Sequence, residues 1–134
     1  MNSGAIVYKD YERPDVDAIA ALYKTSNLRR PVEDRARLQR MYDHSPLVLT
    51  AWDGDRLVGI LRGWSDGGFV GYLADLAVDP RYQGQGIGKE LLYLAIDTNS
   101  EVQFALRAAD AARDYYAHVG WTRIDNGWYW PRSS

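Results

Sequence analysis

The sequence contains no cysteine among its 134 residues. Disulfide frameworks, thiolate metal sites and cysteine nucleophiles are therefore excluded as sources of its chemistry, and we expect no bound metal. It also lacks an apolar run close to the roughly 20 residues that a membrane span needs. Its first ten residues have neither the basic start nor the apolar centre of a signal peptide. We expect a cytoplasmic protein.

A large excess of charge of one sign is missing as well. The 16 Lys and Arg residues nearly balance the 18 Asp and Glu residues, and the formal net charge is -2. This balance gives no overall attraction to nucleic acid or to anionic membranes, so neither is an expected partner. Acidic residues alternate at helical spacing with a local group of arginines, which is typical of a solvated helix face. These arginines are Arg29, Arg30, Arg35, Arg37 and Arg40.

The length and the 46% apolar content suit a single domain over residues 1–134. Apolar periodicity and turn signals predict an α/β (α+β) domain in the order βααβββαβαββ, with about seven strands and four helices. We expect strands at 5–8, 47–52, 56–64, 69–78 and 102–107, and a terminal hairpin of 121–124 with 128–130 around Asn126-Gly127. Helices are expected from Pro14, at 32–42, at 87–98 and at 109–119.

Three glycines alternate at the point where a predicted strand turns into a helix, within the segment 79–89. Such a loop lets backbone N–H groups converge on an anion at the positive end of the helix. The Walker A pattern would need glycine and serine or threonine where Gln83 and Glu90 stand. The dinucleotide fingerprint would need a third glycine where Lys89 stands. Both classes of nucleotide-binding protein are therefore disfavoured.

The motif Gln83-x-x-Gly86-x-Gly88 resembles the pyrophosphate-binding motif of the GNAT (GCN5-related N-acetyltransferase) superfamily. A second signature of that superfamily is a helix tyrosine followed by glycine and an aromatic residue, and Tyr116-x-x-x-Gly120-Trp121 is similar to it. The resemblance covers about residues 47–130 and implies the GNAT acyltransferase fold, with a mixed, mostly antiparallel sheet. The stretches 75–88 and 128–131 are similar to the arylalkylamine, or serotonin-type, group.

The resemblance implies acetyl-CoA as the cosubstrate. Backbone groups of Leu76, Ala77 and Val78 would hold its pantetheine arm in a splayed gap of the sheet. Many GNATs also have an asparagine that contacts this arm seven positions before the tyrosine, where this chain has Ala109 instead. The pyrophosphate would bind the loop residues Gln83, Gly84, Gln85, Gly86, Ile87, Gly88 and Lys89.

Two side chains are candidates for proton transfer. A phenol of pKa roughly 10 is protonated at neutral pH and can donate to a departing thiolate, and Tyr116 matches the general acid of the family. Tyr115 competes for that role. Asp75 is a candidate general base for the attacking amine, although its carboxylate could equally pair with a neighbouring arginine.

These features predict an N-acetyltransferase that moves acetyl from acetyl-CoA to a primary amine by direct attack in a ternary complex. The alternative is a GNAT-like module that binds acetyl-CoA or another acyl-CoA as a sensor, with little turnover. A plain interaction domain would require two correctly ordered motifs to be a coincidence. The acceptor, a small-molecule amine or a protein amino group, stays open. The edge of the expected terminal hairpin favours a homodimer.

Overall fold

The computed structural model describes residues 5–134. Its centre is one mixed sheet in the spatial order β1-β2-β3-β4-β5, antiparallel except for the parallel pair β4 and β5. None of the helices that these residues form is long and apolar enough to cross a membrane. The strands are β1 (Val7–Lys9), β2 (Leu47–Asp53), β3 (Arg56–Ser65), β4 (Val70–Val78) and β5 (Gln103–Leu106).

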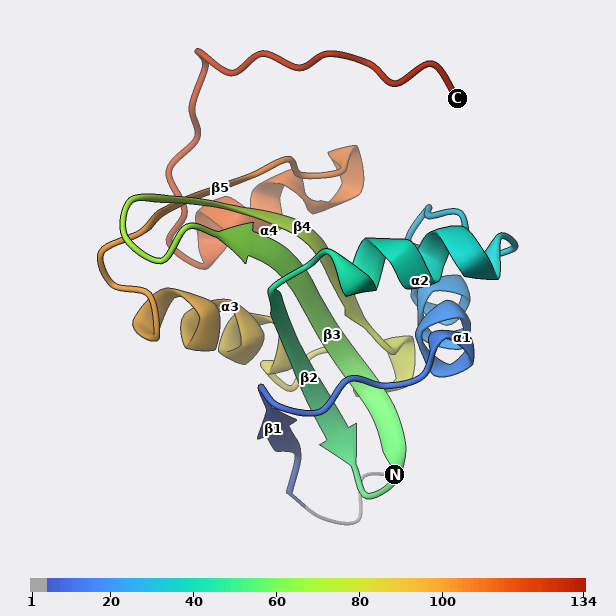
Figure 1. The fold of residues 1–134 in the computed structure, drawn as a ribbon. Helices are drawn as coiled ribbons and strands as arrows, with labels where there is room; N and C mark the ends of the chain where they lie inside the picture. Colours follow the sequence, from blue (N-terminus) through green and yellow to red (C-terminus); the bar gives the residue numbers. More distant parts are fainter. Residues whose placement is uncertain (1–4) are drawn as a thin grey trace.

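Helices cover both faces of the sheet (Figure 1). One face carries α1 (Val16–Ser26) and α2 (Arg35–Asp43), and the other carries α3 (Ile87–Asp97) and α4 (Arg113–His118). Two 3₁₀ turns, η1 (Pro80–Tyr82) and η2 (Asp110–Ala112), lie between β4 and α3 and directly before α4. The order of elements up to α4 and the mixed α/β architecture agree with the expectation from sequence.

Capping residues set the helix boundaries. Asp15 accepts a hydrogen bond from the backbone N–H of Ala18 at 2.9 Å, so α1 begins directly after it. We expect the second helix to begin at position 32, but α2 begins at Arg35. Asp34 is the reason, because its side chain accepts the backbone N–H of Arg37 at 3.0 Å.

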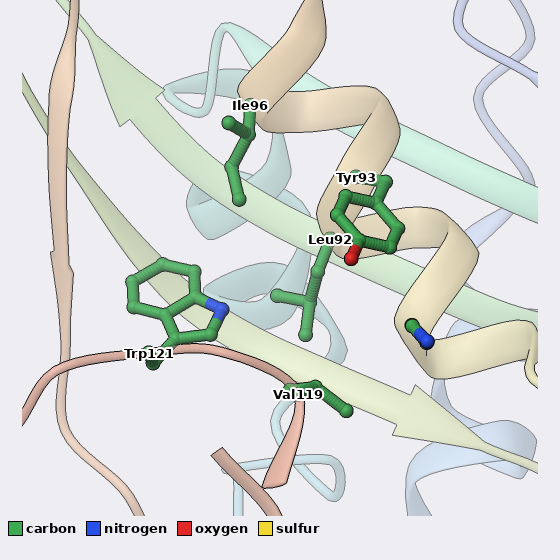
Figure 2. Close-up of a pocket in the computed structure, with 6 residues that line it drawn as sticks. Leu92, Tyr93, Ile96, Val119 and Trp121 are labelled. Atoms are coloured by element: carbon green, nitrogen blue, oxygen red, sulfur yellow. The ribbon is translucent and has the colours of Figure 1, made fainter. Parts of the chain in front are cut away.

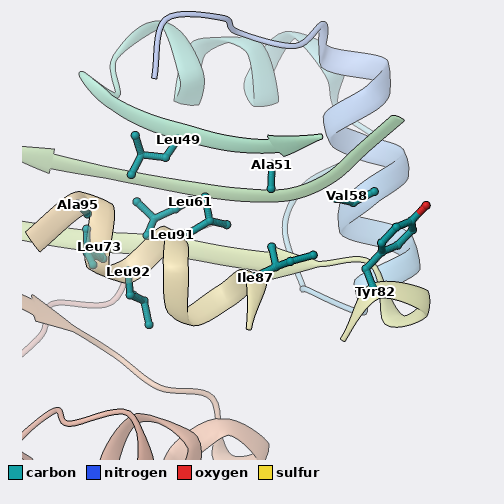
Figure 3. Close-up of a cluster of buried hydrophobic side chains, with 10 residues drawn as sticks. All are labelled: Leu49, Ala51, Val58, Leu61, Leu73, Tyr82, Ile87, Leu91, Leu92 and Ala95. Atoms are coloured by element: carbon teal, nitrogen blue, oxygen red, sulfur yellow. The ribbon is translucent and has the colours of Figure 1, made fainter. Parts of the chain in front are cut away.

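Each face of the sheet has its own apolar core. Ile87, Leu91 and Ala95 recur at helical spacing on α3 and are buried against the central strands (Figure 3). On the other face, α1 and α2 bury a second core around Ile19 and Leu38. The central strands are therefore covered on both sides, and the position of β4 is fixed by packing from both helix layers.

A bulge interrupts β4 close to its middle. Arg62 of β3 pairs with Asp75, while the next residue, Gly63, pairs with Leu73, so Ala74 is the extra residue. On its other side, β4 pairs with β5 only through 70–73, and its second half continues without β5. β5 thus ends beside the bulge, and the second half of β4 has no strand partner on that side. The splayed gap that the GNAT resemblance implies would lie at this place.

The prediction of a terminal hairpin is wrong. Residues 121–134 contain no strand, so the described sheet has five strands rather than about seven. The Asn126-Gly127 pattern predicts a tight turn, but a two-stranded hairpin is stable only where its apolar residues pack on a face. Trp128 and Trp130 are 97% and 94% exposed, and this segment runs as an extended chain away from the sheet (red in Figure 1). The turn preference alone therefore forms no hairpin.

A buried ionic cluster joins β4 to α1, and we call Asp75, Arg30, Arg62 and Tyr23 the Asp75 cluster. Arg30 Nε donates to Oδ1 of Asp75 at 2.6 Å, and Arg62 Nε donates to Oδ2 at 2.6 Å. The Tyr23 hydroxyl also donates to Oδ2, at 2.7 Å. Asp75 is only 3% exposed, so these donors replace the water that its carboxylate loses on folding.

We predict that Asp75→Asn lowers the free energy of unfolding by about 3 kcal/mol, because it leaves two guanidinium groups without their anion. Urea unfolding followed by circular dichroism measures the change. Asp97→Asn, at an exposed position at the end of α3, is the matched control and should change that free energy by less than about 0.5 kcal/mol. Equal loss in both variants would contradict a stabilising role of the cluster.

Candidate active site

The glycine loop lies between β4 and α3. Gln83 Nε2 donates to the backbone carbonyl of Val78 at 3.1 Å, which folds the loop back onto the end of the strand. Gly84 and Gly86 have φ angles of 84° and 80°, in the left-handed region that favours glycine. The backbone of the loop therefore requires glycine at both positions.

Gly86 is the N-cap of α3 and has no side chain with which to cap the helix. The backbone N–H groups of Ile87, Gly88 and Lys89 belong to the first turn, where the helix has no partners of its own for them. The helix dipole adds positive potential at the same place. The loop, in which Gln85 is also exposed, thus has the local properties of an anion site.

Gly88 lies where α3, β4 and α4 come together. A Cβ atom built on it would lie 2.9 Å from the Tyr115 hydroxyl oxygen and 3.7 Å from side-chain atoms of Leu76 and Val78. The Tyr115 hydroxyl therefore lies over the first turn of α3. This tyrosine lies next to the glycine loop rather than in the pocket beside β4.

A small pocket lies beside β4, next to the point where its pairing with β5 ends. Three of the predicted site residues, Tyr116, Asp75 and Leu76, meet in it. The side chain of Ala77 is buried in the α1–α2 core, so only its backbone is available on the gap side. The pocket is lined by Leu61, Leu73, Ala74, Asp75, Leu76, Leu92, Leu106, Arg107 and Tyr116.

Tyr116 reaches this gap from α4. Its ring packs edge-on against Tyr115 and Trp121, at centroid distances of 5.3 and 6.1 Å. Burial, and to a smaller extent the neighbouring Tyr115, raise the pKa of Tyr116 above the ordinary phenol value. The hydroxyl is therefore protonated at neutral pH, as a proton donor must be.

Asp75 lines the same gap, but both of its oxygens accept guanidinium N–H groups. Pairing with arginine, one of the two interpretations of its sequence position, is thus what the structure shows. Burial alone would lower the pKa of Arg62, but the hydrogen bond and charge of Asp75 outweigh it and raise that pKa. Burial also raises the pKa values of Tyr23 and Tyr42, whose hydroxyl oxygens lie 2.5 Å apart. Tyr23, Tyr42 and Arg62 therefore hold their protons more tightly than the same groups do in water.

Sequence analysis missed Arg30 and Arg62. Arg30 was expected on a solvated helix face, but it lies in the connection between α1 and α2, where Nη2 donates to the Ala74 carbonyl at 2.9 Å. Arg30 stands 45 positions from Asp75 along the chain, so no local sequence pattern could predict that these two residues form an ion pair. One signal was present, because Arg62 and Asp75 are charged residues inside otherwise apolar strands.

A second pocket lies between α3 and the chain that follows α4 (Figure 2). Val119 and Trp121 face Leu92 of α3 there, and Lys89 lies at its rim with Nζ 5.7 Å from the Tyr93 ring. The lining is mostly apolar. These contacts hold α4 against α3 and so help to position Tyr116 at the gap.

Ala109 is exposed and directly precedes η2, which begins at Asp110. Its methyl group cannot form the hydrogen bond that an asparagine would offer. At this position the chain therefore lacks the amide side chain of the GNAT pattern.

The chain belongs to the acetyltransferase (GNAT) family, whose model it matches over residues 7–121. An uncharacterized N-acetyltransferase ycf52-like protein of Prochlorococcus marinus is 30% identical over 113 residues, which are 75% of this chain and 61% of that protein. The GCN5-related N-acetyltransferase 2, chloroplastic, of Arabidopsis thaliana is 34% identical over 82 residues, 55% of this chain and 32% of that protein. The chain thus spans about three fifths of the length of the first of these curated relatives and about one third of the second.

Solved structures agree with the fold. A GNAT family acetyltransferase of Streptococcus pneumoniae has a TM-score of 0.76 and 27% identity, over 97% of this chain and 100% of the other. A probable acetyltransferase of Staphylococcus aureus has a TM-score of 0.78 and 24% identity, over 96% and 100% of the two chains. These likenesses confirm the GNAT fold.

Proposed function

We propose that this chain, as one domain, transfers acetyl from acetyl-CoA to a primary amine by direct attack within a ternary complex. The observation that carries the proposal is the gap between β4 and β5, with Tyr116 on its wall and the glycine loop at the end of β4. The GNAT family acts with acetyl-CoA, and PaiA N-acetyltransferase of Thermoplasma acidophilum, a protein of the same fold, was solved in complex with coenzyme A.

The residues of the site suit the parts of acetyl-CoA. The pyrophosphate would receive N–H groups from the loop 83–89, where two glycines with positive φ and an uncapped helix start favour an anion. The pantetheine arm would run beside Leu76–Val78, because β4 has no strand partner there on the β5 side. Because Ala109 has no amide side chain, the backbone of Leu76–Val78 would hold the pantetheine arm without it.

Tyr116 supplies the proton that the leaving group needs. The amine nitrogen bonds to the acetyl carbon, the carbon–sulfur bond breaks, and Tyr116 donates its proton to the departing sulfur. An unperturbed alkylamine has a pKa of roughly 10.4, so the attacking amine must also lose a proton. Because both Asp75 oxygens already accept arginine N–H groups, we assign that proton to water in the gap and give Asp75 a positioning role.

The arylalkylamine likeness of residues 75–88 lies within β4 and the glycine loop, which hold the cosubstrate rather than the acceptor in this proposal. None of the relatives named above is described by such a substrate. The likeness therefore does not name the acceptor, and a small molecule and a protein amino group both stay within the proposal.

Calorimetric titration with acetyl-CoA, followed by thiol release with a panel of amines, tests the function. We expect micromolar binding and release with at least one amine. Gly88→Glu should abolish binding, because it adds bulk and negative charge to the first turn of α3. Its matched control is Gly68→Glu, since a Cβ at Gly68 meets nothing within 4 Å.

The outcomes separate the candidate functions. Binding without thiol release from any amine would favour the sensor over the transferase. No binding by the wild type would overturn the proposal, and unchanged binding by Gly88→Glu would move the pyrophosphate away from the loop.

Tyr116→Phe should lower kcat by about 100-fold while the acetyl-CoA affinity stays within a few-fold, because only the proton donor is lost. Tyr115→Phe is the matched control, since it removes the hydroxyl that lies over α3. Steady-state kinetics and calorimetry measure the two quantities. A larger loss of kcat in Tyr115→Phe than in Tyr116→Phe would exchange the roles of the two tyrosines.

The raised pKa of Tyr116 means that its proton donor form persists above about pH 10, the ordinary phenol value. We expect kcat to rise with pH as the amine loses its proton, and to fall only above about pH 10. A kcat profile from pH 6 to 10.5 measures this. An alkaline fall that starts below pH 9, or one that persists in Tyr116→Phe, would contradict the assignment.

A further inference from the structure

The last part of the chain exposes large aromatic side chains, and we call residues 126–130 the aromatic tail. Trp128 and Trp130 are 97% and 94% exposed, and Tyr129 between them is 67% exposed. An aromatic side chain can bury roughly 150–250 Å² of mostly apolar surface, so exposure of three in a row is unusual. The aromatic tail therefore carries apolar surface that its own fold leaves mostly uncovered.

The aromatic tail has the geometry of a strand. The chain bends at Asp125, and beyond that point neither residue of Asn126-Gly127 has a positive φ angle. A tight type I′ turn requires positive φ at both central residues, so the chain does not reverse there. Side chains alternate between the two faces of an extended chain. Trp128 and Trp130 therefore share one face, and Tyr129 lies on the other.

One edge of the sheet is open to another strand. β5 is the last strand of the sheet that residues 5–134 form, and it pairs with β4 on one side only. Gln103 donates its backbone N–H to the Phe69 carbonyl on the β4 side. Successive residues of a strand direct their backbone groups to opposite sides, so those of Phe104 and Leu106 point away from β4. A further strand can bind these groups.

An apolar surface lies beside that edge. Trp64 of β3 pairs with Tyr72 of β4, and Tyr72 pairs with Ala105 of β5, so their side chains form one row across the sheet. Trp64 and Tyr72 are 48% and 40% exposed, and Val70, two positions before Tyr72, is 42% exposed. None of these three belongs to either apolar core, so the helices leave them uncovered. We call Trp64, Val70 and Tyr72 the edge patch.

We propose that two copies of this chain form a dimer by exchanging their aromatic tails, each of which adds as a strand to the free edge of β5 in the other copy. Trp128 and Trp130 then cover the edge patch, and Tyr129 lies on the opposite face beside Phe104. The edge provides backbone hydrogen bonds, and the alternating side chains fix which face is buried. This inference goes beyond the proposed acetyl transfer, because neither surface lines the pocket beside β4.

The path of the aromatic tail favours a second copy over the β5 edge of its own chain. The tail runs away from the sheet (red in Figure 1), and the Tyr129 ring centroid lies 4.4 Å from the Arg107 guanidinium. Beyond the tail, the Ser134 carbonyl accepts a hydrogen bond from Arg37 at 3.2 Å. To pair with its own β5, the tail would have to turn back at Asn126-Gly127, where the structure has no tight turn. Exchange between copies replaces the two contacts without that turn.

The area that the exchange buries suits a stable dimer. Trp128, Tyr129 and Trp130 of the two copies together can bury on the order of 1,000 Å², at roughly 150–250 Å² for each side chain. The two edge patches add their own share. Specific interfaces bury about 1,200–2,000 Å² in total, so the exchange reaches this range. The formal net charge of -2 per chain gives little repulsion between the copies.

Sedimentation equilibrium of the full chain tests the proposal. We expect the wild type at micromolar concentration to have twice the 15.2 kDa mass of a single chain. The double variant Trp128→Ser with Trp130→Ser should sediment as a single chain, because the tail loses its apolar face. Tyr72→Glu should do the same, because it places a charge in the edge patch. Tyr11→Ser, at an aromatic residue that is 77% exposed outside both surfaces, is the matched control and should stay a dimer.

Hydrogen exchange measured by NMR separates strand exchange from other kinds of association. In the wild type, the amides of Phe104, Leu106 and the aromatic tail should exchange about tenfold or more slowly than in the double tryptophan variant. A wild type that sediments as a single chain overturns the proposal, and a protected tail in that single chain would place it on its own β5. A dimer that persists in the double tryptophan variant or in Tyr72→Glu, or a dimer with an unprotected tail, also overturns it.

Discussion

The pairing of the Asp75 carboxylate with two guanidinium groups is the contact on which the arrangement of the site depends. It forms beside Ala74, the extra residue of the β4 bulge, and Arg30 binds both the carboxylate and the Ala74 carbonyl. A charge this deeply buried requires partners of opposite sign. The connection between α1 and α2 is therefore fastened to β4 at the point where β5 leaves it.

The end of the pairing between β4 and β5 leaves the second half of β4 without a neighbouring strand on one side. Past the bulge, the β5 side of β4 is open to a ligand, and the strand leads directly into the glycine loop. On the face of the sheet that α3 covers, Val119 and Trp121 pack against α3. These contacts hold α4 in place, so that Tyr116 lines the gap. In the proposed function, cosubstrate recognition thus uses mainly backbone, which the fold provides.

The distance along the chain between contacting residues explains how much was predictable from sequence. The glycine loop and the Tyr116 helix are local patterns, in which a few adjacent residues fix both the conformation and the chemistry, and the structure brings both to one side of the sheet. Arg30 could not be placed, because its partner lies on a distant strand and its neighbours favour a helix face. The hairpin at Asn126-Gly127 failed because its stability depends on tertiary packing, and Trp128 and Trp130 have none.

A carboxylate beside the proposed acetyl-transfer site is a candidate general base. The two arginines that bind Asp75 argue against that role here. A proton taken from the amine would neutralise Asp75 and leave Arg30 and Arg62 without the anion that compensates their charge. In the proposed reaction, the positive charge of the same arginines would disfavour the ammonium form of the amine without any proton transfer to the protein. In that proposal, the Asp75 cluster favours attack through its net positive charge while its members stay bound to one another.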